Sequence, residues 1–176
     1  LQRITNGRCN YVEVDELTEG AACTALLAKH LINDDESLLI ANSDQFIEYQ
    51  SENFESLKNL TNVDSMVFTF NAVHPKWSFV KTNSRGFVTE VAEKKPISDI
   101  ATCGIYWYRR GSDFVKYAEQ MIEKNIRVNG EFYIAPVYNE LIQDSKTLIP
   151  FYVENMWGIG TPEDLKYFME NYHGAS

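Results

Sequence analysis

The stretch Leu38-Leu39-Ile40-Ala41-Asn42-Ser43-Asp44-Gln45-Phe46 decides the fold that we predict for this chain. It begins as a short apolar run and then changes to small polar residues with one carboxylate. That pattern is typical of a buried strand in a mostly parallel sheet, with a loop at its carboxyl end. Ligands of open α/β sheets bind just outside the carboxyl ends of strands. Asp44 would therefore stand at the mouth of a crevice, where Mg²⁺ could join its carboxylate to phosphate oxygens. Alternatively, Asp44 only caps the strand or begins a turn.

Composition limits the classes of function. The chain has 176 residues, is 44% hydrophobic and carries a net charge of -9, which is compatible with one domain and a real core. Lys and Arg never cluster in runs longer than a pair, which argues against a nucleic-acid groove or an anionic membrane surface. A phosphate-bearing ligand remains compatible, because a few local cations and backbone N–H groups suffice to bind it. We find no apolar run as long as a membrane span and no signal peptide.

The three cysteines indicate the compartment. Cys9, Cys23 and Cys103 are odd in number and far apart, as expected for reduced thiols of a cytoplasmic protein. Cys103 lies within an apolar stretch and is most simply a small buried hydrophobic residue.

The first part of the chain is predicted to be a strand–helix–strand unit. Residues 10–16 alternate apolar and polar side chains, which predicts a strand, and residues 22–32 keep roughly helical spacing before the strand at Leu38. Thr18 is expected to cap the helix, and the small Gly20 and Ala21 would let a ligand approach its start. Ordinary capping without a ligand is the alternative.

The remaining elements complete an α/β prediction. Two strands flank the turn-rich residues 83–86 and indicate a hairpin, so the sheet departs there from simple alternation. Gly104, inside an apolar strand, marks close approach by a ligand or by backbone. We expect three layers, with helices on both faces of a mixed, mainly parallel sheet. The predicted strands are 65–70, 77–81, 87–91, 100–108 and 148–153; the predicted helices are 54–60, 114–122, 134–142 and one that begins at Thr161 after a loop at 156–160.

Six segments, in the same order along the chain, resemble the motifs of the sugar-phosphate nucleotidyltransferases. They are Thr18-Glu19-Gly20-Ala21-Ala22, Leu39-Ile40-Ala41-Asn42-Ser43-Asp44, Glu93-Lys94, Ala101-Thr102-Cys103-Gly104-Ile105-Tyr106, Asn129-Gly130-Glu131-Phe132-Tyr133 and Gly160-Thr161-Pro162-Glu163-Asp164-Leu165. These Rossmann-like, GT-A-like enzymes join a nucleoside triphosphate to a sugar 1-phosphate and release pyrophosphate. The resemblance covers nearly the whole chain. The residues of these motifs are most similar to those of members from bacterial capsule and surface-polysaccharide pathways.

The resemblance implies a role for each matching residue. Asp44 would hold the Mg²⁺ cofactor and, with Lys94, would be catalytic. The nucleotide would contact Thr18, Gly20 and Ala21, and the expected sugar-phosphate-binding residues are Gly86, Glu93, Lys94, Gly104 and Glu131. Simpler alternatives are a solvated lysine at the end of a hairpin for Lys94 and an acidic residue at a helix start for Glu131.

The chain departs from the family pattern in two respects. The N-terminal strand and the Gly-rich loop that cradles the triphosphate do not occur in it, and it begins with Leu1 rather than Met. We therefore expect one domain over residues 1–176 that lacks these parts, is inactive alone and self-associates as a homo-oligomer. Gly158 stands where many members have an Asp, for which Glu163 or Asp164 would be an imperfect substitute.

Two other classes of function remain open. A GT-A glycosyltransferase could use Ser43-Asp44-Gln45 as a degenerate metal motif and take a finished nucleotide-sugar, although the closing motif and the Asn129-Gly130-Glu131 segment argue against it. A binding or assembly module without catalytic activity is the third class. Pyrophosphate release from a triphosphate and a sugar phosphate separates the first class from the other two.

Overall fold

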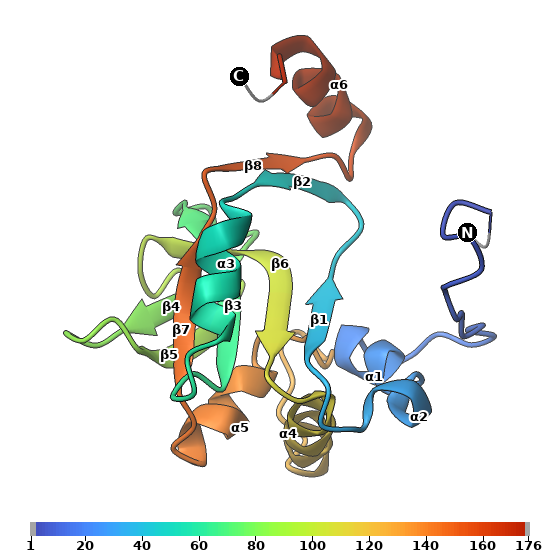
Figure 1. Ribbon diagram of the computed structural model, residues 1–176, viewed down its shortest axis with the longest axis vertical. Helices are drawn as coiled ribbons and strands as arrows, with labels where there is room; N and C mark the ends of the chain where they lie inside the picture. Colours follow the sequence, from blue (N-terminus) through green and yellow to red (C-terminus); the bar gives the residue numbers. More distant parts are fainter. Residues whose placement is uncertain (1–2, 175–176) are drawn as a thin grey trace.

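A mixed six-stranded sheet with helices on both faces forms the body of the computed structural model, which describes residues 3–174 (Figure 1). The strands are β1 (Leu38–Ala41), β2 (Gln45–Glu48), β3 (Ser65–Asn71), β4 (Ser78–Thr82), β5 (Val88–Glu93), β6 (Ile100–Tyr108), β7 (Leu148–Tyr152) and β8 (Asn155–Gly158). The helices are α1 (Ala21–Leu26), α2 (Lys29–Ile32), α3 (Ser51–Lys58), α4 (Gly111–Glu123), α5 (Val137–Gln143) and α6 (Pro162–Asn171). The sheet order is β5-β4-β6-β3-β7, with β1 also paired to β6.

The long strand β6 organises the sheet. All but its first residue are buried, and β3 pairs with it along one side. On the other side, β4 pairs with its beginning at Ala101, and β1 pairs with its end from Ile105 to Tyr108. The chain that precedes β4 and the chain that follows β1 therefore diverge beside residues 102–104, and this divergence positions the candidate site.

The prediction of a mainly parallel sheet is wrong in the direction of the strands. The pairings show that β1, β3, β4 and β7 run one way, whereas β5 and β6 run the other way. Because β6 lies between β1 and β3, most neighbouring strands are antiparallel, and β3–β7 is the parallel pair among the described strands. The mixed α/β class is confirmed. With β6 on one side only, β1 alternates half-buried and exposed residues and is not the fully buried strand that we expected.

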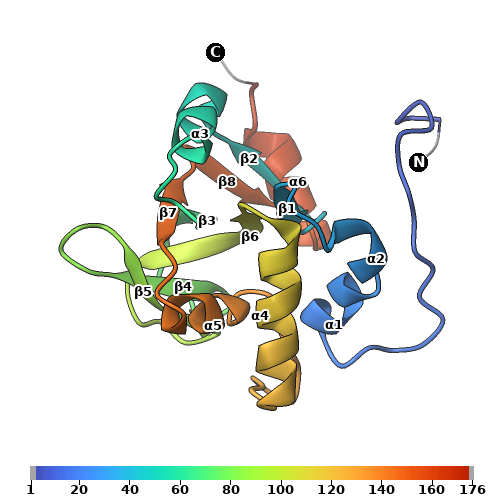
Figure 2. The same ribbon diagram turned by 60° about the horizontal axis from the view of Figure 1, so that its bottom comes forward.

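Helices lie on both sides of the sheet, which confirms the three-layer architecture (Figure 2). Buried side chains form two hydrophobic clusters, one on each face. Helices α4 and α5 cover one face, where Tyr138 stacks on Tyr108 and its hydroxyl donates to the carbonyl oxygen of Met66 at 2.9 Å. On the other face, Phe54 from α3 packs against Phe68 and other aromatic side chains. The amphipathic spacing of α4 and the apolar strands together account for both clusters.

The chain that follows β1 enters a second, small sheet. After β1 the chain continues into β2, which pairs antiparallel with β8 at one end of the molecule (Figure 1). Part of the loop expected at 156–160 is therefore a strand. The sequence did not predict it, because a four-residue strand with a glycine shows too little alternation to be recognised. Helix α6 begins as predicted, since the backbone N–H of Asp164 donates to the Thr161 hydroxyl at 3.1 Å.

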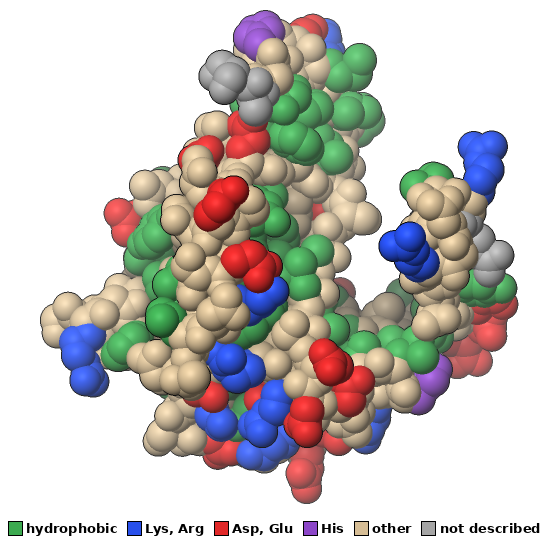
Figure 3. All heavy atoms as spheres, viewed as in Figure 1, with side chains coloured by type: hydrophobic (Ala, Val, Ile, Leu, Met, Phe, Trp, Pro, Cys, Tyr) green, Lys and Arg blue, Asp and Glu red, His purple; other side chains and the backbone are tan. Residues whose placement is uncertain are grey.

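The strand predicted at residues 10–16 is wrong. Residues 8–17 have no regular secondary structure, and the N-terminal segment runs apart from the body (Figure 1 and Figure 3). Tyr11 is 64% and Val14 50% exposed. Alternation reports which side chains are apolar, but a strand also needs a neighbouring edge with which to form hydrogen bonds. No strand within residues 3–174 pairs with residues 10–16.

The helix predicted over residues 22–32 is two short helices, α1 and α2. Its expected cap at Thr18 is also wrong, because Gly20 occupies the N-cap position and makes no side-chain cap. The Thr18 hydroxyl instead lies 2.6 Å from that of Thr24. Within residues 3–174 no helix is long and apolar enough to cross a bilayer.

Candidate functional site

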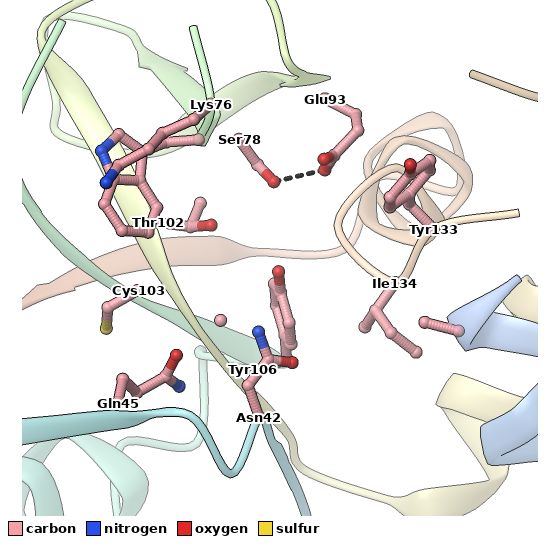
Figure 4. Close-up of a pocket in the computed structure, with 13 residues that line it drawn as sticks. Asn42, Gln45, Lys76, Ser78, Glu93, Thr102, Cys103, Tyr106, Tyr133 and Ile134 are labelled. Atoms are coloured by element: carbon pink, nitrogen blue, oxygen red, sulfur yellow. Dashed lines mark hydrogen bonds between the residues drawn. The ribbon is translucent and has the colours of Figure 1, made fainter. Parts of the chain in front are cut away.

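A cavity of about 270 Å³ opens where the chain around β1 and β4 diverges along β6 (Figure 4). Its walls come from segments far apart in the sequence. They are formed by Ala21, Asn42, Gln45, Lys76, Trp77, Ser78, Glu93, Thr102, Cys103, Gly104, Tyr106, Tyr133 and Ile134.

Gly104 lets Asn42 and Gln45 lie directly against β6. Its φ of +73° is in the left-handed region, and a Cβ there would lie 2.4 Å from Nδ2 of Asn42 and 3.2 Å from Oε1 of Gln45. The backbone N–H of Asn42 also donates to the Gly104 carbonyl oxygen at 3.0 Å. Close approach occurs at Gly104, but the side chains of Asn42 and Gln45 make it, not the ligand or the backbone that we expected. It places two amide side chains in the cavity wall.

A carboxyl group and a hydroxyl group face each other inside the cavity. The Ser78 hydroxyl donates a hydrogen bond to Glu93, and the β4–β5 register places these residues opposite each other. Burial raises the pKa of Glu93, and the Ser78 bond and the charge of Lys94 oppose this shift only in part. Glu93 is therefore a half-buried acceptor that suits a hydroxyl-bearing ligand.

Lys94 stands at the rim of the cavity, held by Tyr133. Its φ of +54° is unusual for lysine, and its backbone N–H donates to the Trp77 carbonyl oxygen at 3.0 Å. Its Nζ donates to the Tyr133 hydroxyl at 2.6 Å and lies 4.6 Å from the centre of that ring. The bond to Tyr133 raises the pKa of Lys94, so the side chain is a fixed positive charge beside Glu93.

The segment around Gly20 is tied to the segment around Phe132. The Phe132 backbone donates to the Glu19 carbonyl oxygen at 2.8 Å and accepts from the Ala22 N–H at 2.9 Å. Gly20 has φ +130°, and a Cβ there would lie 2.5 Å from the Phe132 carbonyl oxygen. A glycine is thus required at position 20 because the backbone of Phe132 leaves no room for a side chain. The pairing brings Ala21 and Tyr133 into the same part of the cavity wall.

Asp44 lies just outside the cavity lining, between the two residues whose amides line it. Its carbonyl oxygen accepts from the Ile159 N–H at 2.8 Å, and its Oδ2 is 2.8 Å from where a Cβ at Gly160 would stand. Asp164 approaches the same loop, with Oδ2 3.6 Å from the position of a Cβ at Gly158. Two carboxylates thus flank residues 158–160.

The donor set around Asp44 can be compared with the needs of Mg²⁺. No group of three or more His, Cys, Asp or Glu side chains within residues 3–174 could enclose a metal ion. Mg²⁺ usually takes one or two carboxylates and completes its shell with water and substrate phosphates. An exposed carboxylate at Asp44 fits a cation that binds together with a phosphate ligand.

Of the nine predicted site residues, Ala21, Glu93 and Gly104 line the cavity, and Asp44, Lys94 and Gly20 each adjoin a lining residue in the sequence. The other three do not line it. Gly86 is at the tip of the β4–β5 hairpin, Glu131 is exposed, and Thr18 bonds within its own segment. Sequence reasoning missed Asn42, Gln45, Lys76, Trp77, Ser78, Thr102 and Tyr133. Some of these residues could have been predicted from the sequence. Asn42 and Gln45 lie close to Asp44 in the chain, and the register of the predicted hairpin would have placed Ser78 opposite Glu93.

Comparison with known proteins supports the fold. No protein-family model matches the sequence, and no curated protein matches it significantly. A nucleoside-diphosphate-sugar pyrophosphorylase from Vibrio cholerae RC9 superposes with a TM-score of 0.77 at 25% identity, over 97% of this chain and 74% of its own. A protein assigned as a glucose-1-phosphate thymidylyltransferase from Bacillus anthracis gives 0.73 at 17%, over 99% and 71%. A UDP-glucose pyrophosphorylase, solved with UDP-glucose, gives 0.68 at 16%, over 89% and 64%.

These similarities agree with the mixed sheet and its three layers. The chain has the Rossmann-like α/β fold of the sugar-phosphate nucleotidyltransferases that it resembles.

Proposed function

We propose that this chain is a sugar-phosphate nucleotidyltransferase domain, which joins a nucleoside triphosphate to a sugar 1-phosphate and gives a nucleotide-sugar and pyrophosphate. One observation carries the proposal. In a chain with this fold, the cavity beside β6 combines the half-buried carboxyl of Glu93 with the fixed ammonium group of Lys94 at its rim. The carboxyl group can accept hydrogen bonds from sugar hydroxyls, and the neighbouring cation can bind a phosphate. Together they match the two ends of a sugar phosphate.

The polar wall opposite Glu93 supports a sugar. Asn42 and Gln45 carry amides that can both donate and accept hydrogen bonds. Nε2 of Gln45 is buried and has no hydrogen-bond partner within residues 3–174. A buried unpaired donor is unfavourable in the free protein, so a ligand oxygen that accepts from it would bind more tightly.

The reaction requires positioning rather than covalent catalysis by the protein. An oxygen of the sugar phosphate forms a bond to the α-phosphorus, and the bond from that phosphorus to the pyrophosphate oxygen breaks. Lys94 would hold the sugar phosphate, Glu93 would orient the sugar, and Asp44 would hold Mg²⁺. A bound Mg²⁺ would neutralise phosphate charge that develops in the transition state. The segment of Thr18, Gly20 and Ala21 would face the base.

The biological setting is the finer part of the proposal. The residues of the six motifs favour a bacterial nucleotide-sugar that is used for capsule or surface polysaccharide. The odd number of dispersed cysteines favours the cytoplasm, where nucleotide and sugar phosphate are available. Gly86 and Glu131 remain proposed sugar-phosphate contacts on the strength of the resemblance alone.

A substrate panel tests the proposal and separates it from the other classes. Pyrophosphate release is measured with each common nucleoside triphosphate against several sugar 1-phosphates, with and without Mg²⁺. The assay uses both the 176-residue chain and the protein encoded by the complete reading frame. From the protein encoded by the complete reading frame we expect release that needs both substrates. Sugar transfer from a finished nucleotide-sugar would instead identify a glycosyltransferase, and binding without either reaction would identify a binding module.

A further inference from the structure

Lys76 is a second cation of the cavity, and the function proposed above leaves it unused. It lies in the turn that precedes β4, where its backbone N–H donates to Nδ1 of His74 at 3.2 Å. Its Nζ lies 4.6 Å from the centre of the Trp77 ring, and both side chains line the cavity. None of the ion pairs within residues 3–174 includes Lys76.

The turn before β4 brings Lys76 to the cavity. Lys76, Trp77 and Ser78 follow one another in the chain and all line it, so the alternation of an extended strand does not hold at this turn. Ser78 meets Glu93 inside the cavity. Trp77 fixes this geometry further, because its ring packs edge-on against Phe70 with 5.2 Å between ring centres.

The two lysines stand at different ends of the cavity. Figure 4 shows Lys76 on the side opposite Tyr133, with Glu93 between them. Lys94 is anchored on the Tyr133 side by its hydrogen bond to the tyrosine hydroxyl. One phosphate held at Lys94 therefore leaves the Lys76 ammonium group facing another part of the same ligand.

We propose that the cavity takes a sugar phosphate with a second acidic group, a carboxylate or another phosphate, and that Lys76 binds this group. The inference rests on the proposed function. Lys76 is exposed at the cavity, and its ammonium group makes stronger hydrogen bonds to an anion than to a neutral hydroxyl. In a chain with a net charge of -9, an unpaired cation there favours an acidic ligand over a neutral one.

The test is equilibrium binding by isothermal titration calorimetry. Glucose 1-phosphate is compared with glucuronic acid 1-phosphate and glucose 1,6-bisphosphate, and a nucleoside triphosphate is titrated separately. The variant Lys76→Met keeps the length of the side chain and its contact with Trp77 but removes the charge. The control Lys81→Met removes an exposed lysine of β4 that does not line the cavity.

We expect the wild-type protein to bind a doubly acidic ligand about tenfold more tightly than glucose 1-phosphate, the effect of one good charge-assisted contact. Lys76→Met should abolish this preference and change glucose 1-phosphate affinity less than twofold. Lys81→Met should change neither affinity.

Three results would overturn the inference and leave the proposed function standing. Equal losses for both ligand types in Lys76→Met would mean that Lys76 binds the shared phosphate. A loss confined to the triphosphate would assign Lys76 to the nucleotide. Binding of glucose 1-phosphate with no preference for a second acidic group would remove the premise. If no sugar phosphate binds to the wild-type protein, the proposed function fails and the inference fails with it.

Discussion

Replacing Gly104 with alanine should destabilise the protein and disrupt the cavity, for two separable reasons. The left-handed backbone, with φ of +73°, costs an alanine about 1–2 kcal/mol relative to glycine. The new Cβ would also lie 2.4 Å from Nδ2 of Asn42, so the amide must move, and such overpacking costs about 1–3 kcal/mol. Together these costs lower the melting temperature by about 10 °C for a domain of this size.

Gly86 gives a matched control for the stability measurement. It also has a positive φ, +82°, but a Cβ there would meet nothing within 4 Å. Gly86→Ala should therefore show the backbone cost alone, about 5 °C. Sugar-phosphate affinity should fall more than tenfold in Gly104→Ala, because the displaced Asn42 amide no longer forms the wall. Equal melting temperatures for the two variants, together with unchanged affinity in Gly104→Ala, would refute this reasoning.

Two further predictions concern the carboxyl and the lysine of the cavity. Tyr133→Phe keeps the ring under Lys94 but removes the hydroxyl that fixes its Nζ, so the dissociation constant for a sugar phosphate measured by calorimetry should rise several-fold. An unchanged constant would argue against a positioning role for Tyr133. Burial raises the pKa of Glu93 above 4.5, so the folded protein holds this proton more tightly than the unfolded chain, and the resulting stability is lost as pH rises through the raised pKa. Urea unfolding should therefore show Glu93→Gln gaining stability relative to wild type as the pH rises above 4.5; the opposite trend would contradict the assigned cause.

The sequence predicted those elements whose own side chains carry the signal. Strand β6 was predicted from Ile100 to Tyr108 because nearly every one of its residues is apolar, and the hairpin before it because its turn is rich in Gly, Asn and Ser. Strand direction carries no such signal, so the insertion of β6 between β1 and β3 was not predictable from periodicity. Residues 10–16 show the reverse case, in which alternation is present but none of the strands within residues 3–174 pairs with them.

The candidate site divides in the same way. Glu93 and Lys94 stand beside each other in a recognisable pair, and both lie at the cavity, one in its wall and one at its rim. Tyr133 and Lys76 belong to the site only because strand register and the contact between Gly20 and Phe132 bring distant segments together. Their roles depend on distances that no local pattern contains.

The most direct test of the central claim compares Asp44→Asn with the unchanged protein encoded by the complete reading frame, in an assay of pyrophosphate release. The substitution keeps the size of the side chain and removes the charge expected to hold Mg²⁺. The unchanged protein should release one pyrophosphate for each nucleotide-sugar formed, only when triphosphate and sugar 1-phosphate are both present. Asp44→Asn should lower this rate on the order of a thousandfold without changing the melting temperature. Near-normal release by Asp44→Asn, or release that does not depend on the sugar phosphate, would contradict the account.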